Sequence, residues 1–190
     1  MKIVGLLLAA GSASRFGSDK LRHRLPHGVP IAVQSARQLL SETSRVVAAV
    51  RDADMKALLE QEGCRAVVCG NAAEGMGASL ACAARAAGAA DGYLVALADM
   101  PFIRRTSIGA VREALEKGAV LAAPYFRSRR GHPVGVGAVF FDSLLDLHGD
   151  EGAKDLLRRN EKRLVKIPVG DPGVIRDIDT PGDLAPPIAV

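Results

Sequence analysis

The sequence predicts an α/β protein built on a mainly parallel sheet, and three observations support this fold class. Short apolar runs rich in Val, Ile and Leu recur along the 190 residues. Stretches with helical spacing of apolar residues separate most of these runs, which is typical of βαβ units. No internal repeat, linker or low-complexity segment divides the chain. We therefore expect a single domain over residues 1–190, with helices layered on both faces of the sheet.

Each expected element occupies one of these periodic stretches. The expected strands are Ile3–Ala9, Val46–Val50, Ala66–Cys69, Tyr93–Leu97, Val120–Ala123, Pro133–Phe140 and Leu164–Ile167. The clearest expected helices are Ile31–Ser41, Met55–Glu62, Ala78–Ala87, Ser107–Lys117 and Ala153–Asn160. Strands and helices alternate along the chain, which favours a three-layer arrangement.

The first fifteen residues fit two incompatible interpretations. A lysine, the apolar run Ile3 to Ala10 and the small residues that follow resemble a secretory signal with its cleavage site. The same letters describe a buried strand that enters a glycine-containing loop. We favour the strand, because the βαβ alternation begins with this run and its removal would delete the strand expected at the centre of the sheet.

Composition excludes several classes of function. The longest apolar run is far short of the roughly 20 residues that span a bilayer, so we expect no membrane segment. The chain has 25 Lys and Arg against 21 Asp and Glu, with no basic tail, no Trp and two Tyr. This mild positive charge without aromatic platforms argues against nucleic-acid binding and suits a small anionic substrate. Three cysteines, Cys64, Cys69 and Cys82, show no metal-type spacing, and a reducing cytoplasm fits them best.

The segment AAGSASRFGSDK follows the first expected strand, where open α/β sheets bind ligands. Gly11 and Gly17 allow close approach of the backbone to a ligand, and Arg15 and Lys20 supply positive charge for a polyphosphate. The spacing matches neither a Walker A motif nor GxGxxG. The alternative is an ordinary Gly/Ser turn with two solvated cations.

Asp99 in YLVALADMPFI is the leading metal candidate. It lies just past the expected strand Tyr93–Leu97, and a carboxylate there can hold Mg²⁺ against triphosphate oxygens. The alternative role, capping the helix expected near Ser107, is disfavoured by the intervening residues and by Pro101.

The C-terminal stretch IRDIDTPGDL offers Asp177, Asp179 and Asp183, any of which could complete a metal site. Thr180 followed by Pro181 equally suggests the N-cap of a helix. The residues alone leave these alternatives open.

Elsewhere, GMGASL is a glycine-containing turn that opens a helix, and RGHPVG is a loop that leads into a strand. A single histidine such as His132 is more often structural than catalytic.

Taken together, these segments resemble a known family. LLLAAGSASRFGSDKL resembles the LAAGxSxRxGxxK loop of nucleotidyltransferases that activate small compounds with a nucleoside triphosphate. LADMPFI, RGHPVG, GDEGAKDLL and DIDTPGDL are similar to the subset of molybdenum cofactor cytidylyltransferases. The resemblance covers nearly the whole chain, with the five motifs in family order.

The resemblance implies a three-layer Rossmann-like nucleotidyltransferase fold, mostly parallel with one antiparallel strand. It implies a catalytic set of Arg15, Lys20 and Asp99, and Mg²⁺ held by Asp99 and Asp179. It assigns the acceptor side to Arg130 and His132. The nucleotide-binding residues that it implies are Ala9, Ala10, Gly11, Arg15, Lys20, Gly75, Gly77 and Ser79.

The implied reaction is attack by the terminal phosphate of molybdopterin on the α-phosphorus of CTP, with release of pyrophosphate. Such a transfer needs alignment and charge neutralisation more than covalent catalysis, which suits a site of cations, glycines and carboxylates. A molybdoenzyme is the candidate recipient of the product. GTP-using relatives typically carry glycine where this chain has Ala10, so the resemblance favours CTP.

Three alternatives remain at the level of sequence. One is a guanylyltransferase of the same pathway, or a relative that uses another phosphate-bearing acceptor. The second is a secreted small-ligand-binding protein whose N-terminus is a signal. The third is a non-catalytic chaperone that binds the molybdenum cofactor.

Overall fold

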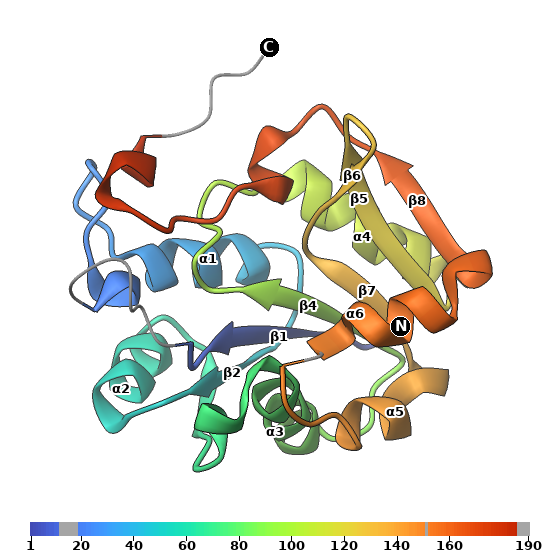
Figure 1. Ribbon diagram of the computed structural model, residues 1–190, viewed down its shortest axis with the longest axis horizontal. Coiled ribbons are helices and arrows are strands. Elements are labelled where there is room, and N and C mark those ends of the chain that lie inside the picture. The colour runs from blue at the N-terminus through green and yellow to red at the C-terminus, as the bar shows by residue number, and fades with distance from the viewer. Residues whose placement is uncertain (12–18, 151, 186–190) are drawn as a thin grey trace.

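The structure is a computed structural model that describes residues 1–11, 19–150 and 152–185. Within these residues, one eight-stranded sheet has the order β3-β2-β1-β4-β7-β5-β6, with β8 paired to β5 (Figure 1). Its strands are β1 (Ile3–Ala9), β2 (Val46–Val50), β3 (Arg65–Val68), β4 (Gly92–Leu97), β5 (Leu121–Phe126), β6 (Arg129–Arg130), β7 (Val134–Gly137) and β8 (Leu164–Pro168). The α/β fold with a mostly parallel sheet, predicted from the sequence, is confirmed.

The first strand lies inside the sheet, with parallel partners β2 and β4 on its two edges. All seven residues of β1 are buried. Successive side chains of a strand point to opposite faces, so Ile3 and Leu7 join one core cluster while Val4 and Leu6 join the other. The strand interpretation of the first apolar run is therefore confirmed, and this run contributes to both cores.

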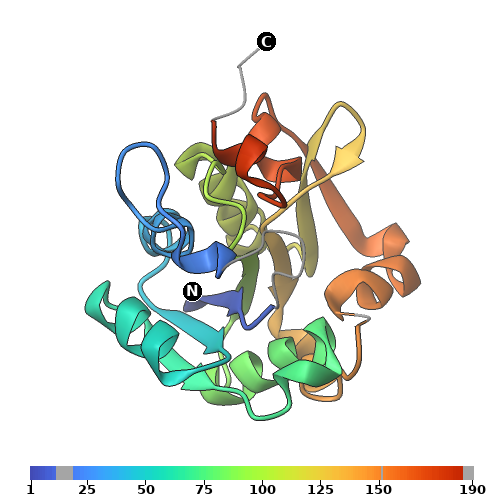
Figure 2. The ribbon, with the colours of Figure 1, turned by 60° about the vertical axis from the view of Figure 1, so that its left-hand side comes forward.

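Helices cover both faces of the sheet, as Figure 1 and the rotated view in Figure 2 show. They are α1 (Ile31–Leu40), α2 (Ala53–Gln61), α3 (Met76–Ala87), α4 (Arg105–Glu116), α5 (Phe141–Leu145) and α6 (Gly152–Arg159). Buried residues of α1, α2 and α4 belong to one core cluster, and those of α3, α5 and α6 to the other. Six short 3-10 helices connect the elements of the described chain, η1 (Lys20–Arg22), η2 (Ala72–Glu74), η3 (Ala138–Phe140), η4 (Glu161–Arg163), η5 (Pro172–Ile175) and η6 (Pro181–Leu184).

The expected antiparallel strand is β7, which runs antiparallel to both β4 and β5. The predicted strand Pro133–Phe140 is wrong in its second half, because β7 ends at Gly137 and η3 and α5 follow. A short apolar run such as Ala138 to Phe141 fits a strand and a helix equally well by period alone. Here the helical form lets the Phe141 ring stack on Tyr93, with 5.6 Å between ring centroids.

Two further features lie outside the sequence predictions. Cys69 and Cys82 form a disulfide between the segment after β3 and helix α3, and Cys64 is a buried free thiol. A two-residue strand, β6, pairs with β5 around a turn in which Arg127 and Ser128 both have positive φ. Among the residues described, no helix is long and apolar enough to cross a membrane.

Candidate active site

The carboxyl ends of the parallel strands β1, β2 and β4 meet at one edge of the sheet. Beside this edge lies a cavity of about 670 Å³, within the usual range for small-molecule sites. It is lined by Leu8, Ala10, Gly11, Lys20, Leu21, Arg51, Cys69, Gly70, Ala72, Ala73, Gly75, Met76, Ser79, Leu97, Asp99 and Asp150. Ligands of open α/β sheets bind at this edge, so the cavity is the candidate active site.

Asp99 lies two residues beyond the end of β4, where it is partly exposed to the cavity. Its backbone oxygen accepts a hydrogen bond from the Ile178 amide at 2.9 Å, which ties the C-terminal segment to this strand end. Ile178 is fully buried, and the residues on either side of it are acidic. The buried isoleucine therefore anchors Asp177 and Asp179 beside Asp99.

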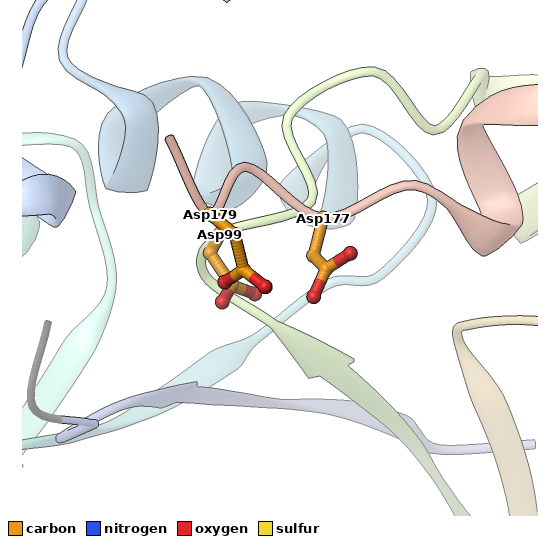
Figure 3. Close-up of side chains that lie close together, drawn as sticks. All are labelled: Asp99, Asp177 and Asp179. Atoms are coloured by element: carbon orange, nitrogen blue, oxygen red, sulfur yellow. The ribbon is translucent and has the colours of Figure 1, made fainter. Parts of the chain in front are cut away.

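The three carboxylates form one cluster. Oxygen atoms of Asp99, Asp177 and Asp179 lie within 4.8 Å of one another. Figure 3 shows Asp99 after β4, with Asp177 and Asp179 projecting from the neighbouring C-terminal segment. Several carboxylate oxygens at this spacing are the donor set preferred by a hard divalent cation such as Mg²⁺ or Mn²⁺. The residues present therefore fit a divalent metal ion.

Lys20 brings a positive charge into contact with this cluster. Its Nζ lies 2.9 Å from Asp99 Oδ2 and 3.3 Å from Asp179 Oδ1, and its side chain is only 11% exposed. Burial lowers the pKa of Lys20, but the charges and hydrogen bonds of Asp99 and Asp179 outweigh this effect and raise the pKa above its ordinary value. Lys20 is therefore a permanent cation at the cavity.

Asp183 has a different role from its acidic neighbours. Its Oδ2 accepts hydrogen bonds from the Thr180 hydroxyl at 2.8 Å and from the Thr180 amide at 2.9 Å. The bond from the Thr180 amide is one half of a capping box at η6 (Pro181–Leu184), and both bonds lower the pKa of Asp183. The N-cap interpretation of IRDIDTPGDL is thus observed, because Thr180 caps a short 3-10 helix. Asp177 and Asp179 lie in the acidic cluster, and their role in binding a metal ion stays a prediction.

The start of α3 forms the opposite side of the cavity. Gly75 and Ser79 line the cavity, and the Ser79 hydroxyl donates to the Gly75 carbonyl at 3.2 Å. Gly77 is absent from the lining. Its amide donates to the Gly149 carbonyl at 2.7 Å, and a Cβ on Gly77 would lie 2.5 Å from the His148 carbonyl oxygen. Gly77 thus allows close packing of the chain at Gly149 against α3.

The other sequence-predicted residues lie in several places. Ala9 and Ala10 are buried at the end of β1, and Gly11 is exposed. Arg15 lies outside the described residues. Arg130 is exposed on β6, next to the loop that contains His132. Neither Arg130 nor His132 is among the described residues that line the cavity.

His132 is held close to the sheet. Its amide donates to the Val174 carbonyl at 2.8 Å, and its Nδ1 lies 3.5 Å from the Val95 carbonyl oxygen. Burial lowers the pKa of His132, and the charge of Arg130 acts in the same direction. Burial therefore favours the neutral imidazole, whereas Arg130 lies on the exposed hairpin.

Sequence reasoning missed two charged residues that line the cavity, Arg51 and Asp150. Arg51 directly follows β2, so the same strand-end argument that selected Asp99 would have found it. Asp150 lies within the motif GDEGAKDLL, but nothing in its local pattern marks it as a cavity residue. Its position follows from the packing of Gly149 against Gly77.

Comparison with known proteins identifies the family. The sequence matches the MobA-like NTP transferase domain over residues 5–164. The chain belongs to the MobA-like NTP transferase family. It is 29% identical to nicotine blue oxidoreductase of Paenarthrobacter nicotinovorans and 31% identical to the purine catabolism protein PucB of Bacillus subtilis, in each case over 94% of this chain and 92% of the relative.

Solved structures share the fold of this MobA-like chain. A nucleotidyl transferase from Methanothermobacter thermautotroptrophicus superposes with a TM-score of 0.80 at 21% identity, covering 95% of this chain and 93% of that one. A manganese complex of Rv0371C from Mycobacterium tuberculosis has a TM-score of 0.77 at 21% identity, with 96% of each chain covered. The nucleotidyltransferase family and fold expected from the sequence are therefore confirmed.

Proposed function

We propose that this protein is a metal-dependent cytidylyltransferase that transfers CMP from CTP to the terminal phosphate of a molybdopterin-type cofactor. The observation that carries the proposal is the contact of Lys20, which lines the cavity together with Ala10 and Gly75, with the carboxylates of Asp99 and Asp179. A cation and a carboxylate cluster beside a nucleotide-sized cavity suit phosphoryl chemistry. Membership of the MobA-like NTP transferase family supports the same class of reaction.

In the proposed reaction, a terminal phosphate oxygen of the acceptor forms a bond to the α-phosphorus of CTP. The bond between that phosphorus and the oxygen bridging to the β-phosphate breaks, and pyrophosphate leaves with the electron pair. The nucleophile is already an anion and needs no general base. The enzyme must therefore align two anions and offset their charge.

Different residues of the chain would align the two substrates and offset their charge. Lys20 stays protonated at neutral pH and offers a buried cation to the triphosphate, with Arg51 as a second cation at the same cavity. Gly11, at the end of β1, leaves room for the backbone to approach a phosphate. We assign the base and ribose to the side formed by Gly75 and Ser79, and the acceptor to the side of Arg130 and His132.

Asp99 and Asp179 would hold Mg²⁺, with Asp177 adjacent as a third carboxylate. Bound there, the ion would supply positive charge to the phosphate oxygens of the triphosphate. The manganese complex of the similarly folded Rv0371C supports a divalent cation in this fold. The cytoplasm, where nucleoside triphosphates are available, is the proposed site of action, and a molybdoenzyme is the proposed recipient of the product.

The test is to incubate the full chain with Mg²⁺, molybdenum cofactor and each of the four nucleoside triphosphates. Stoichiometric pyrophosphate and a cytosine dinucleotide product, formed only with metal and acceptor present, are expected. Preferred use of GTP would favour the guanylyltransferase alternative, and cofactor binding without pyrophosphate would favour the chaperone. A parallel assay of NAD(P)H oxidation is informative because one relative is named an oxidoreductase. Turnover in that assay alone would overturn the proposal.

A further inference from the structure

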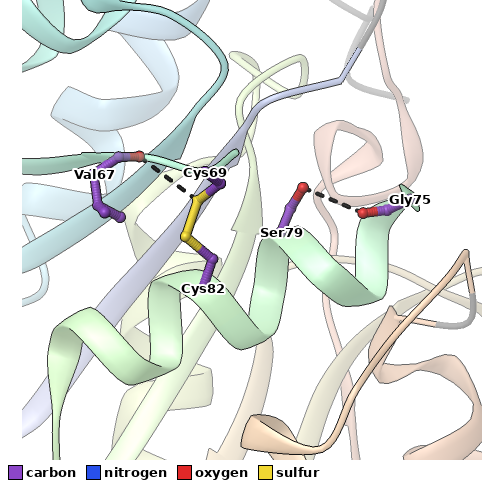
Figure 4. Close-up of a disulfide and its surroundings, with 5 residues drawn as sticks. All are labelled: Val67, Cys69, Gly75, Ser79 and Cys82. Atoms are coloured by element: carbon purple, nitrogen blue, oxygen red, sulfur yellow. Dashed lines mark hydrogen bonds between the residues drawn. A yellow bond between two sulfur atoms is a disulfide. The ribbon is translucent and has the colours of Figure 1, made fainter. Parts of the chain in front are cut away.

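The disulfide between Cys69 and Cys82 adjoins the candidate active site. Cys69 follows β3 and itself lines the cavity, whereas Cys82 lies on α3 and is absent from the lining. Figure 4 shows the bond crossing from the strand end to the helix, one turn beyond Ser79. The bond therefore links the end of β3 to α3, the helix that carries the cavity residues Met76 and Ser79.

The segment closed by this bond forms much of the cavity wall. Its lining residues after Cys69 are Gly70, Ala72, Ala73, Gly75, Met76 and Ser79. These are small or flexible side chains, so the shape of this wall depends on where the backbone lies. Interactions that restrain the backbone of this segment therefore also determine the shape of the cavity.

Between Cys69 and Gly75, few long-range interactions restrain the backbone of this segment. The Cys69 amide donates to the Val50 carbonyl at 2.9 Å, which fixes the segment where it leaves the sheet. Between that bond and Gly75, the backbone hydrogen bonds in the described chain are local, including Ala72 to Cys69 at 3.1 Å and Glu74 to Asn71 at 3.0 Å. The disulfide is thus a covalent link across a stretch that is held by short-range bonds from Cys69 to Gly75 and by packing against Gly149 where α3 begins.

We propose that Cys69 and Cys82 form a redox-sensitive clamp that tightens nucleotide binding when oxidised. This inference rests on the proposed nucleotide site. In the oxidised protein the disulfide holds the segment from Cys69 to Ser79 near the conformation that binds the nucleotide. The segment then loses less conformational entropy when the nucleotide binds. In the reduced protein the segment samples more conformations, and the binding-competent fraction falls. Disulfides of reducing compartments are commonly of this regulatory kind.

The chemistry is ordinary thiol–disulfide exchange with a low-molecular-weight disulfide such as glutathione disulfide. The two cysteine thiols lose two protons and two electrons in total, and one glutathione disulfide is reduced to two glutathione molecules. Cys69 borders the cavity but is only 4% exposed, whereas Cys82 is partly buried, so exchange would begin at Cys82. Cys64 is a poor competitor, since burial raises the pKa of its thiol to about 11.

The experiment is calorimetric titration of CTP into the full chain, fully oxidised or fully reduced, in the presence of Mn²⁺. We expect the oxidised protein to bind CTP about fivefold or more tightly, the lower end of typical coupling between sites. Cys82→Ser should bind like the reduced protein in both buffers, because it removes the link without changing a cavity residue. Cys64→Ala is the matched control and should keep the full redox response.

Thermodynamic linkage between CTP binding and disulfide formation gives a second, independent measurement. If oxidation tightens CTP binding, saturating CTP must shift the thiol–disulfide equilibrium toward the disulfide by the same factor. Thiol titration in glutathione buffers of known ratio measures this shift. Equal CTP affinity in the two redox states, or tighter binding by the reduced protein, would overturn the clamp while leaving the proposed function intact. Failure of both forms to bind any nucleotide would instead count against the proposed function and the clamp together.

Discussion

The two sides of the cavity are built in different ways. The charged side, with Lys20, Asp99 and Asp179, has Asp99 directly beyond a central strand whose position is set by the hydrogen bonds of the sheet. The opposite side, from Cys69 to Ser79, offers glycines and small side chains, and it is positioned by a disulfide and by close backbone contact at Gly149. The charged side places ionised groups at defined positions, and the backbone of the opposite side determines the shape of the cavity.

This difference predicts how each side responds to mutation. Changing a charged residue should alter chemistry or ligand affinity while leaving the fold intact, because the carboxylates of Asp99 and Asp179 are partly exposed and Lys20 lies on the short helix η1. Changing a residue of the opposite side should alter stability and affinity together, because the residues that define its shape also hold the chain in place.

Asp99→Asn should give the largest effect on catalysis. The amide keeps the shape of the carboxylate but loses the charge that faces Lys20 and that would hold a divalent ion. We expect kcat/KM for CMP transfer to fall by about 100-fold or more, the usual effect of removing a principal electrostatic group. Asp142→Asn, an exposed aspartate in the first turn of α5, is the control and should leave the rate unchanged. A loss within tenfold would refute the role given to Asp99.

Lys20→Ala should mainly weaken nucleotide binding. The substitution removes a buried cation and leaves Asp99 and Asp179 facing each other without it. A charge-assisted hydrogen bond contributes roughly 1.5–3 kcal/mol, so we expect the Kd for CTP to rise by about 10- to 100-fold. Calorimetric titration measures this, with Lys117→Ala, an exposed residue just beyond the end of α4, as the control. An unchanged Kd would mean that Lys20 serves the fold rather than the ligand.

Gly77→Ala should affect stability first. The new methyl group would lie 2.5 Å from the His148 carbonyl oxygen, a backbone atom that moves only with its loop. Alanine favours helix formation by up to about 1 kcal/mol over glycine, but forcing the packed chains apart typically destabilises by about 1–3 kcal/mol. We expect a net fall in the free energy of unfolding, measured by urea titration, together with weaker CTP binding.

A matched substitution isolates the effect of packing at Gly77. At Gly170 an added Cβ meets no atom within 4 Å, so Gly170→Ala should unfold like the wild type. If Gly77→Ala were as stable as Gly170→Ala, the contact between α3 and Gly149 would not position this side of the cavity.

The sequence predicted the charged side better than the opposite side, for a physical reason. A strand that is buried on both faces is uniformly apolar, so β1 and β2 were predicted with their observed bounds, and Asp99 follows from its place after a strand. The pairing of Lys20 with Asp179 spans 159 positions and could be inferred only through a family resemblance. The opposite side has no such local marker. The disulfide, the role of Gly77 and the position of Asp150 all depend on packing between segments that the one-dimensional pattern does not connect.

Ala10→Gly should give the smallest effect, on the choice of base. Ala10 is buried at the end of β1 and lines the cavity, so its methyl group narrows the space between the charged side and the glycine-containing side. A steric difference of one methyl group contributes roughly 1–3 kcal/mol to selectivity, equivalent to about 10- to 200-fold. We therefore expect the wild type to prefer CTP over GTP. In Ala10→Gly the preference should shrink by about tenfold without reversing, because the backbone from Gly70 to Gly75 still limits the cavity on its other side. Measurement of kcat/KM with both nucleotides in both proteins tests this. Equal use of GTP by the wild type would show that the charged side alone governs binding and that the base is selected elsewhere, which would favour the guanylyltransferase alternative.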